Sequence, residues 1–97
     1  MCKQELFKQT AESVAEATEI ALSRILSDDT AAEIVDARHL LIRILVYHGL
    51  YPSEVARLMH CSRRTVSYVI TNFDERLARS WVMRRAWEAI GKQYGNG

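Results

Sequence analysis

The sequence lacks several features that would assign it to a common class of protein. No apolar run approaches the roughly 20 residues that span a membrane, and the amino terminus lacks the basic-then-apolar pattern of a secretory signal. No Gly-x-x-x-x-Gly-Lys phosphate loop is present, and Cys2 and Cys61 do not stand at metal-ligand spacing. No Ser–His–Asp arrangement or pair of carboxylates supports catalysis. We therefore expect a cytoplasmic protein that is not an enzyme, contacts no membrane, and binds no cofactor, metal ion or nucleotide.

Charge is nearly balanced over the whole chain but unevenly distributed along it. Thirteen Lys and Arg residues stand against twelve Asp and Glu, and this net charge of +1 does not indicate a strongly basic nucleic-acid binder. However, residues 1–36 hold three basic and eight acidic residues, whereas residues 37–97 hold ten basic and four acidic. The second part suits a phosphate-bearing partner, and the first suits solvent or another protein. Chance asymmetry among solvated helix faces is the alternative.

Apolar residues recur at spacings of three and four along most of the chain, which predicts helices and no strand. At 97 residues, the chain is long enough for one domain with one core. Predicted helices cover residues 4–18, 23–26, 31–48, two segments within 52–77, and a last segment that follows Ser80. Gly49 is expected to end the third helix in the left-handed conformation, and the tail at residues 95–97 is expected to be disordered. The fold class is therefore all-α, with five to six helices.

Polar residues that can cap helices stand before most of these segments. The candidate N-caps, in chain order, are Ser23, Asp29 or Thr30, Tyr51 or Ser53, Ser62 and Ser80. The side chains expected to face inward from the short second helix are Ile25 and Leu26. Those expected to do so from the last helix are Val82, Met83, Trp87 and Ile90. Of the two tryptophans, which are six residues apart, one is expected to cover the core and the other to be partly exposed.

The segment from Pro52 to Thr71 has the pattern of a helix-turn-helix, that is, two short helices joined by a tight turn. Counting Pro52 as the first position, the small residue Ala56 falls fifth, where the two helices must approach closely. The apolar side chains fall where such a unit buries them, at Val55, Met59, Cys61, Val66 and Val69. In a helix-turn-helix, the first turns of the second helix meet base edges in the DNA major groove. Residues 62–77 are therefore the predicted recognition helix.

The outward positions of that helix carry polar and basic side chains. Arg63 and Arg64 are placed to reach a guanine or a phosphate, and cations at a helix N-terminus oppose the helix dipole, so a negative partner is indicated. The other candidate contacts in the helix are Ser62, Thr65, Ser67, Tyr68 and Thr71. Outside the helix, the candidates are Arg38, Arg43 and Arg57. Ordinary solvated surface is the alternative for each of these residues, and for Arg38 so is an ion pair with Glu33 or Asp36.

The order of these motifs resembles the C-terminal DNA-binding domain of the bacterial replication initiator DnaA. The resemblance rests on Ala37-Arg38 at the start of the central helix, on Tyr51-Pro52-Ser53-Glu54-Val55, and on Arg64-Thr65-Val66. It covers about residues 10–80 and implies a DNA-binding fold of bacterial or phage type, with Arg38 and Thr65 at positions of the family's DNA contacts. The family's basic loop is replaced by the acidic segment 27–32, and its Gly-Arg-Asp-His run by Cys61-Ser62-Arg63-Arg64. A different base preference is therefore implied, and initiator activity is not.

The sequence predicts a small protein that binds double-stranded DNA and acts as a regulator or a replication accessory factor. Because a single unit offers a small interface, a second copy of the chain or another protein is an expected additional partner. The main alternative is a protein-interaction module that keeps the helix-turn-helix and binds a partner through its acidic first helix or its Trp-bearing last helix. RNA binding is a further alternative.

Overall fold

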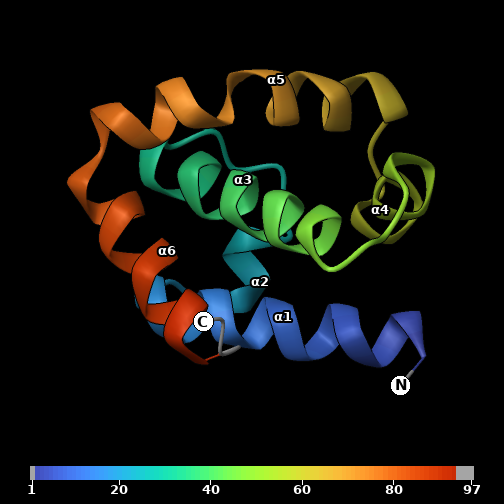
Figure 1. Ribbon diagram of the computed structural model, residues 1–97, viewed down its shortest axis with the longest axis horizontal. Helices are drawn as coiled ribbons and strands as arrows, with labels where there is room; N and C mark the ends of the chain where they lie inside the picture. Colours follow the sequence, from blue (N-terminus) through green and yellow to red (C-terminus); the bar gives the residue numbers. More distant parts are fainter. Residues whose placement is uncertain (1, 94–97) are drawn as a thin grey trace.

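The computed structural model describes residues 2–93, and in this part of the chain it contains six α helices and no strand (Figure 1). The helices are α1 (Lys3–Thr18), α2 (Leu22–Ile25), α3 (Ala32–Tyr47), α4 (Pro52–Met59), α5 (Arg63–Arg79) and α6 (Trp81–Gln93). The all-α prediction with five to six helices is thus confirmed. None of the helices in residues 2–93 has both the length and the apolar character that crossing a bilayer requires. The predicted disordered tail, residues 95–97, lies outside the described residues.

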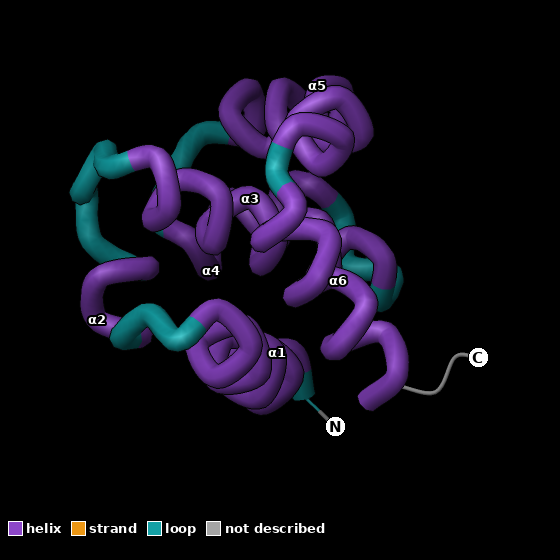
Figure 2. The backbone as a smooth tube through the Cα atoms, turned by 90° about the vertical axis from the view of Figure 1, so that its left-hand side faces the viewer, coloured by secondary structure: helices purple, strands orange, loops and turns teal. Residues whose placement is uncertain are grey.

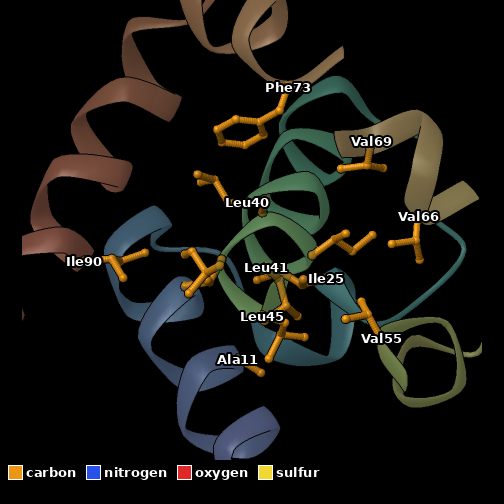
Figure 3. Packing of buried hydrophobic residues seen from close by; sticks show 14 of the residues in the cluster. Ala11, Ile25, Leu40, Leu41, Leu45, Val55, Val66, Val69, Phe73 and Ile90 are labelled. Carbon is orange, nitrogen blue, oxygen red and sulfur yellow. The ribbon is translucent and has the colours of Figure 1, made fainter. Parts of the chain in front are cut away.

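Helix α3 is the centre of the fold, with α1 and α5 on opposite sides of it (Figures 1 and 2). Eight of its sixteen residues are buried: Ile34, Ala37, His39, Leu40, Leu41, Ile42, Ile44 and Leu45. A helix that is apolar on most of its circumference must be covered on several sides. Figure 3 shows Leu40, Leu41 and Leu45 of α3 among side chains from the surrounding helices.

The end of α3 is fixed by a glycine, as the sequence predicts. Gly49 has a φ of +96°, a conformation that L residues rarely adopt. Its backbone N–H donates to the carbonyl of Val46 at 2.9 Å, and the N–H of Leu50 donates to that of Leu45 at 3.2 Å. This pair of bonds is the Schellman motif, with the buried Leu50 packing back on the core. The chain therefore reverses sharply and delivers Pro52 to the start of α4.

Helices α1 and α6 contact each other and both pack against α3 (Figure 1). Helix α1 buries Thr10, Ala11 and Val14, and α6 buries Met83, Ala86 and Ile90. The Trp87 ring of α6 packs on Phe73 of α5, with 5.1 Å between ring centroids. The other tryptophan, Trp81, is 61% exposed. The expected division between one core-covering and one exposed tryptophan is confirmed.

Several local predictions were wrong at helix starts and ends. Ser23 lies inside α2, because the N-cap position is taken by Ala21. Asp29 does accept a hydrogen bond from the backbone of Ala31 at 2.9 Å, but Ala31 itself occupies the N-cap of α3. Leu26 and Val82, both expected to face inward, are 45% and 50% exposed. Each stands next to a fully buried neighbour on a short or terminal helical turn, where spacing alone does not determine the inward face.

Candidate nucleic-acid interface

The turn between α4 and α5 holds the two helices in a fixed relation. His60 adopts the left-handed conformation with φ 55°, and the Cys61 N–H donates to the carbonyl of Ala56 at 2.9 Å. The side chain of Ala56 is buried, and Cys61 is partly buried against the core. At the other end of α4, the Glu54 carboxylate accepts from the backbone N–H of Tyr51 at 2.9 Å and pairs with Lys3 of α1. The start of α5 is thus positioned by closely packed backbone.

Helix α5 is anchored by one apolar stripe and begins at a strong cap. Val66, Val69 and Phe73, spaced by three and four residues, are almost completely buried (Figure 3). The Ser62 hydroxyl accepts from the Thr65 N–H at 3.1 Å and lies 2.9 Å from the Thr65 hydroxyl. This confirms Ser62 as the N-cap. The helix continues to Arg79, two residues beyond its predicted end.

All candidate DNA contacts in residues 62–71 lie on the solvent side of this anchored helix. The exposed residues are Ser62, Arg63, Arg64, Thr65, Ser67, Tyr68 and Thr71, and Arg57 of α4 is exposed as well. Arg64, Tyr68 and Thr71 follow spacings of four and three, which place them on one face. Within residues 2–93, none of the guanidinium groups of Arg57, Arg63 and Arg64 has a hydrogen bond or an ion pair.

The charge at the start of α5 is unfavourable for the isolated protein. The first turn carries no acidic residue, so Arg63 and Arg64 face the positive end of the helix dipole without compensation. Opposition of this kind costs about 0.3–1 kcal/mol for each cation at a helix terminus. Further along the helix, the exposed side chains of Asp74 and Glu75 carry negative charge. A phosphate backbone would therefore be attracted to the first turn of α5, which carries Arg63 and Arg64, and repelled by the fourth, which carries Asp74 and Glu75.

Arg38 and Arg43 are engaged inside the fold. The Arg38 guanidinium donates to the carbonyls of Ile25 (2.9 Å), Ser27 (2.7 Å) and Asp29 (3.0 Å), and so it holds the α2–α3 connection against α3. Neither of the ion pairs considered for it forms, since Asp36 pairs instead with Arg76 at 2.6 Å. The Arg43 guanidinium lies over the Phe73 ring, 5.9 Å from its centroid. Arg38 and Arg43 therefore differ from the unpartnered arginines near the turn.

One of the two carboxylates in the acidic segment before α3 is neutralised by an arginine of α2. Asp29 pairs with Arg24 at 3.1 Å. The backbone hydrogen bond from Ala31, together with Arg24, lowers the pKa of the Asp29 carboxyl. Asp28 remains exposed. The segment that replaces the basic loop expected from the resemblance therefore presents less free negative charge than its composition indicates.

Two exposed tyrosines flank the connection between α3 and α4, and the sequence analysis did not identify either of them as a surface residue. Tyr47 and Tyr51 are 67% and 72% exposed, one at the last residue of α3 and the other at the N-cap of α4. Apolar spacing gave no signal of their exposure, because Tyr47 stands three residues after the buried Ile44 and Tyr51 four residues before the buried Val55. Arg79, exposed in the last turn of α5, was missed as well.

Neither cysteine forms a disulfide bond. Cys2 is an exposed free thiol, and Cys61 is a partly buried free thiol whose pKa is raised by desolvation. Because the thiolate is the reactive form, burial makes Cys61 less reactive. In the described part of the chain, no group of three or more His, Cys, Asp or Glu side chains is placed to hold a metal ion.

Comparison with known proteins provides no relative. No protein-family model matches the chain, and neither a curated protein nor a solved structure matches it significantly. The function must therefore be argued from the geometry of the site.

Proposed function

We propose that this protein binds double-stranded DNA through its helix-turn-helix, with the first two turns of α5 in the major groove. The observation that supports this most is the start of α5. Arg63 and Arg64 are exposed there, oppose the helix dipole, and have no hydrogen bond or ion pair in the described part of the chain. A negative ligand would turn this cost into an attraction. The order of motifs that resembles the DnaA C-terminal domain supports the same docking mode.

Some exposed side chains of this helix-turn-helix suit base recognition, and others suit contacts to the DNA backbone that would position the protein. An arginine can donate two hydrogen bonds to O6 and N7 of a guanine, which discriminates against other bases by about 1–3 kcal/mol. Ser62, Ser67 and Thr71 offer hydroxyls to phosphate oxygens or bases, and Tyr68, which is 59% exposed, offers a ring to a sugar or a thymine methyl group. Arg57 adds a phosphate contact from α4. A protein of this kind would act as a regulator or as an accessory factor in replication.

The test is selection from a random pool of duplexes at about 100 mM salt, where nonspecific phosphate binding is already weakened. We expect one enriched motif for the native protein and its loss in the Arg63→Ala/Arg64→Ala variant. Arg79→Ala is the matched control, because it removes an exposed arginine from the opposite end of the same helix. Circular dichroism should show that all three proteins are folded.

The salt dependence of the affinity gives an independent measure of the number of phosphate contacts. If Arg57, Arg63 and Arg64 each neutralise a phosphate, log affinity should fall against log salt with a slope of about −3 for each copy of the chain. The slope should approach about −1 in the Arg63→Ala/Arg64→Ala variant. Absence of an enriched motif, or an affinity that does not change with salt, would contradict sequence-specific DNA binding through α5.

A protein-interaction module is the second candidate, and the exposed Trp81 and Val82 favour it. In that case, binding to the partner would persist without DNA and would be unaffected by the Arg63→Ala/Arg64→Ala substitutions. Loss of binding on substitution of Trp81 would complete the distinction.

A further inference from the structure

A groove of about 640 Å³ opens at the end of the molecule opposite the helix-turn-helix. It lies between the end of α1, the start of α3 and the start of α6. Its floor is largely apolar, with Ile20, Ala37, Leu40, Val82 and Met83 among its lining residues. In Figure 1, this is the end at which the chain passes from α5 into α6, and the turn between α4 and α5 is at the other end.

A protruding aromatic group stands directly beside this groove. Trp81 is 61% exposed, and its neighbour Val82, 50% exposed, lines the groove. The Arg85 guanidinium lies over the Trp81 indole, 5.9 Å from the ring. Ser80 holds the helix start by accepting from the Met83 N–H at 3.2 Å, and Arg84 ties the same corner to α5 through the carbonyls of Leu77 and Ala78. The protrusion is therefore rigidly mounted.

The charges of the groove and of the protrusion are opposite. Glu19 and Glu33 line the groove, are exposed, and form no ion pair with any side chain of residues 2–91. The two other charged groups of the lining are already neutralised, because Asp36 pairs with Arg76 and Arg24 with Asp29. The groove thus keeps two free carboxylates, while the adjoining protrusion carries the cation of Arg85.

From this arrangement we infer that the groove binds a second copy of this chain in a two-fold symmetric dimer. A symmetric interface uses the same patch on both copies, so the patch must be complementary to itself. Here a basic aromatic protrusion and an acidic apolar hollow lie side by side. Trp81 of one copy enters the groove of the other, and Arg85 approaches Glu19 and Glu33 of that copy. Tryptophan and arginine are the residues most enriched among those that dominate binding energy at protein interfaces.

The dimer would also extend the proposed function without depending on it. Helix α5 has 17 residues and is about 25 Å long, so its first turns lie far from the Trp81 end. Two copies joined at that end would present their α5 starts at separate positions. A two-fold related pair of recognition helices is what a DNA site with two symmetric half-sites requires. Dimerisation is measured without DNA, so its failure would leave the proposed DNA binding untouched.

Sedimentation velocity on the full chain, without DNA, at concentrations up to about 100 μM is the first experiment. We expect a reversible monomer–dimer equilibrium. Trp81→Ala should raise the dissociation constant about 30-fold or more, as for a hot-spot residue. Tyr51→Ala is the matched control. Tyr51 is an aromatic residue that is 72% exposed at the N-cap of α4, away from the groove, and its substitution should leave the equilibrium unchanged.

A charge exchange tests the pairing itself. The Arg85→Glu variant and the Glu19→Lys/Glu33→Lys variant should each be monomeric, because each would face like charges in its own symmetric dimer. Mixed together, they should form a one-to-one complex, since every contact then joins opposite charges. A native protein that stays monomeric at the highest concentration would overturn the inference. So would a dimer that is indifferent to Trp81→Ala, or two variants that stay separate on mixing.

Discussion

Protonation of His39 should control the stability of this fold in mildly acidic solution. His39 lies on α3 and is 9% exposed, and its buried Nδ1 atom has no hydrogen-bond partner. Desolvation, with a further contribution from the nearby Arg76, lowers its pKa from 6.5 to about 4. Arg38 acts in the same direction, and Asp36 opposes it. The folded protein therefore strongly prefers the neutral imidazole.

The sign and size of the effect follow from the two pKa values. Above pH 6.5, the imidazole is neutral in both the folded and the unfolded chain, and the full stability is present. As the pH falls from 6.5 toward 4, the unfolded chain takes up a proton that the folded chain resists. The free energy of unfolding should therefore fall by about 2 kcal/mol by pH 5 and by about 3 kcal/mol by pH 4.

Urea denaturation at a series of pH values between 7.5 and 4.5 measures this loss. His39→Gln is the comparison, because it keeps a polar side chain at the site and cannot titrate in this range. The native protein should lose about 2 kcal/mol more than the variant between pH 7 and pH 5. An NMR titration of the imidazole proton signals gives the pKa of His39 directly. A His39 pKa near 6.5, or identical pH profiles for the two proteins, would refute the reasoning.

Three further predictions concern the elements that position the site. Arg38→Ala should lower the free energy of unfolding by about 1.5–3 kcal/mol, measured in urea, because three backbone carbonyls lose a charged donor. Wild-type stability would show that these bonds contribute little. Ser62→Ala should lower the free energy of unfolding by about 1 kcal/mol, because the N-cap of α5 is lost. Ser67→Ala, at an exposed interior position of the same helix, should not cause this loss. His60→Gly should raise the melting temperature, because glycine relieves about 0.5–1 kcal/mol of left-handed backbone strain in the turn. A lowered melting temperature would argue against that strain.

The outward face of α5 could be predicted because periodicity alone determines it. Val66, Val69 and Phe73 fix the buried side of a long helix, and every polar candidate at residues 62–71 then falls on the exposed side. The cap at Ser62 and the left-handed Gly49 were equally local, and both are confirmed. Features that depend only on neighbouring residues along the chain can thus be predicted from sequence.

The roles of Arg38 and Asp36 could not be predicted, because their partners come from distant segments. Arg38 binds carbonyls 9 to 13 residues before it, and Asp36 pairs with an arginine 40 residues away. Val82 was expected to be buried, yet it lies at the first turn of α6 beside an open groove. In each case, the packing of whole helices against one another determines the environment. Spacing within a single helix carries no information about it.

Contacts between distant segments also change how the excess of basic residues in 37–97 should be interpreted. Of the nine arginines in that part, four are engaged within the fold: Arg38, Arg43, Arg76 and Arg84. Arg85 lies over the exposed Trp81 ring at the surface. The remaining four, Arg57, Arg63, Arg64 and Arg79, are exposed and have no hydrogen bond or ion pair within the described residues. Three of these four belong to the last turns of α4 or the first turn of α5, around the helix-turn-helix corner. Binding to DNA by release of counterions requires guanidinium groups that are free to contact phosphates. The positive charge available for DNA is therefore smaller than the composition indicates, but it is concentrated at the helix-turn-helix corner. In the proposed function, a single copy would therefore make few phosphate contacts, and the proposed dimer through Trp81 would double their number.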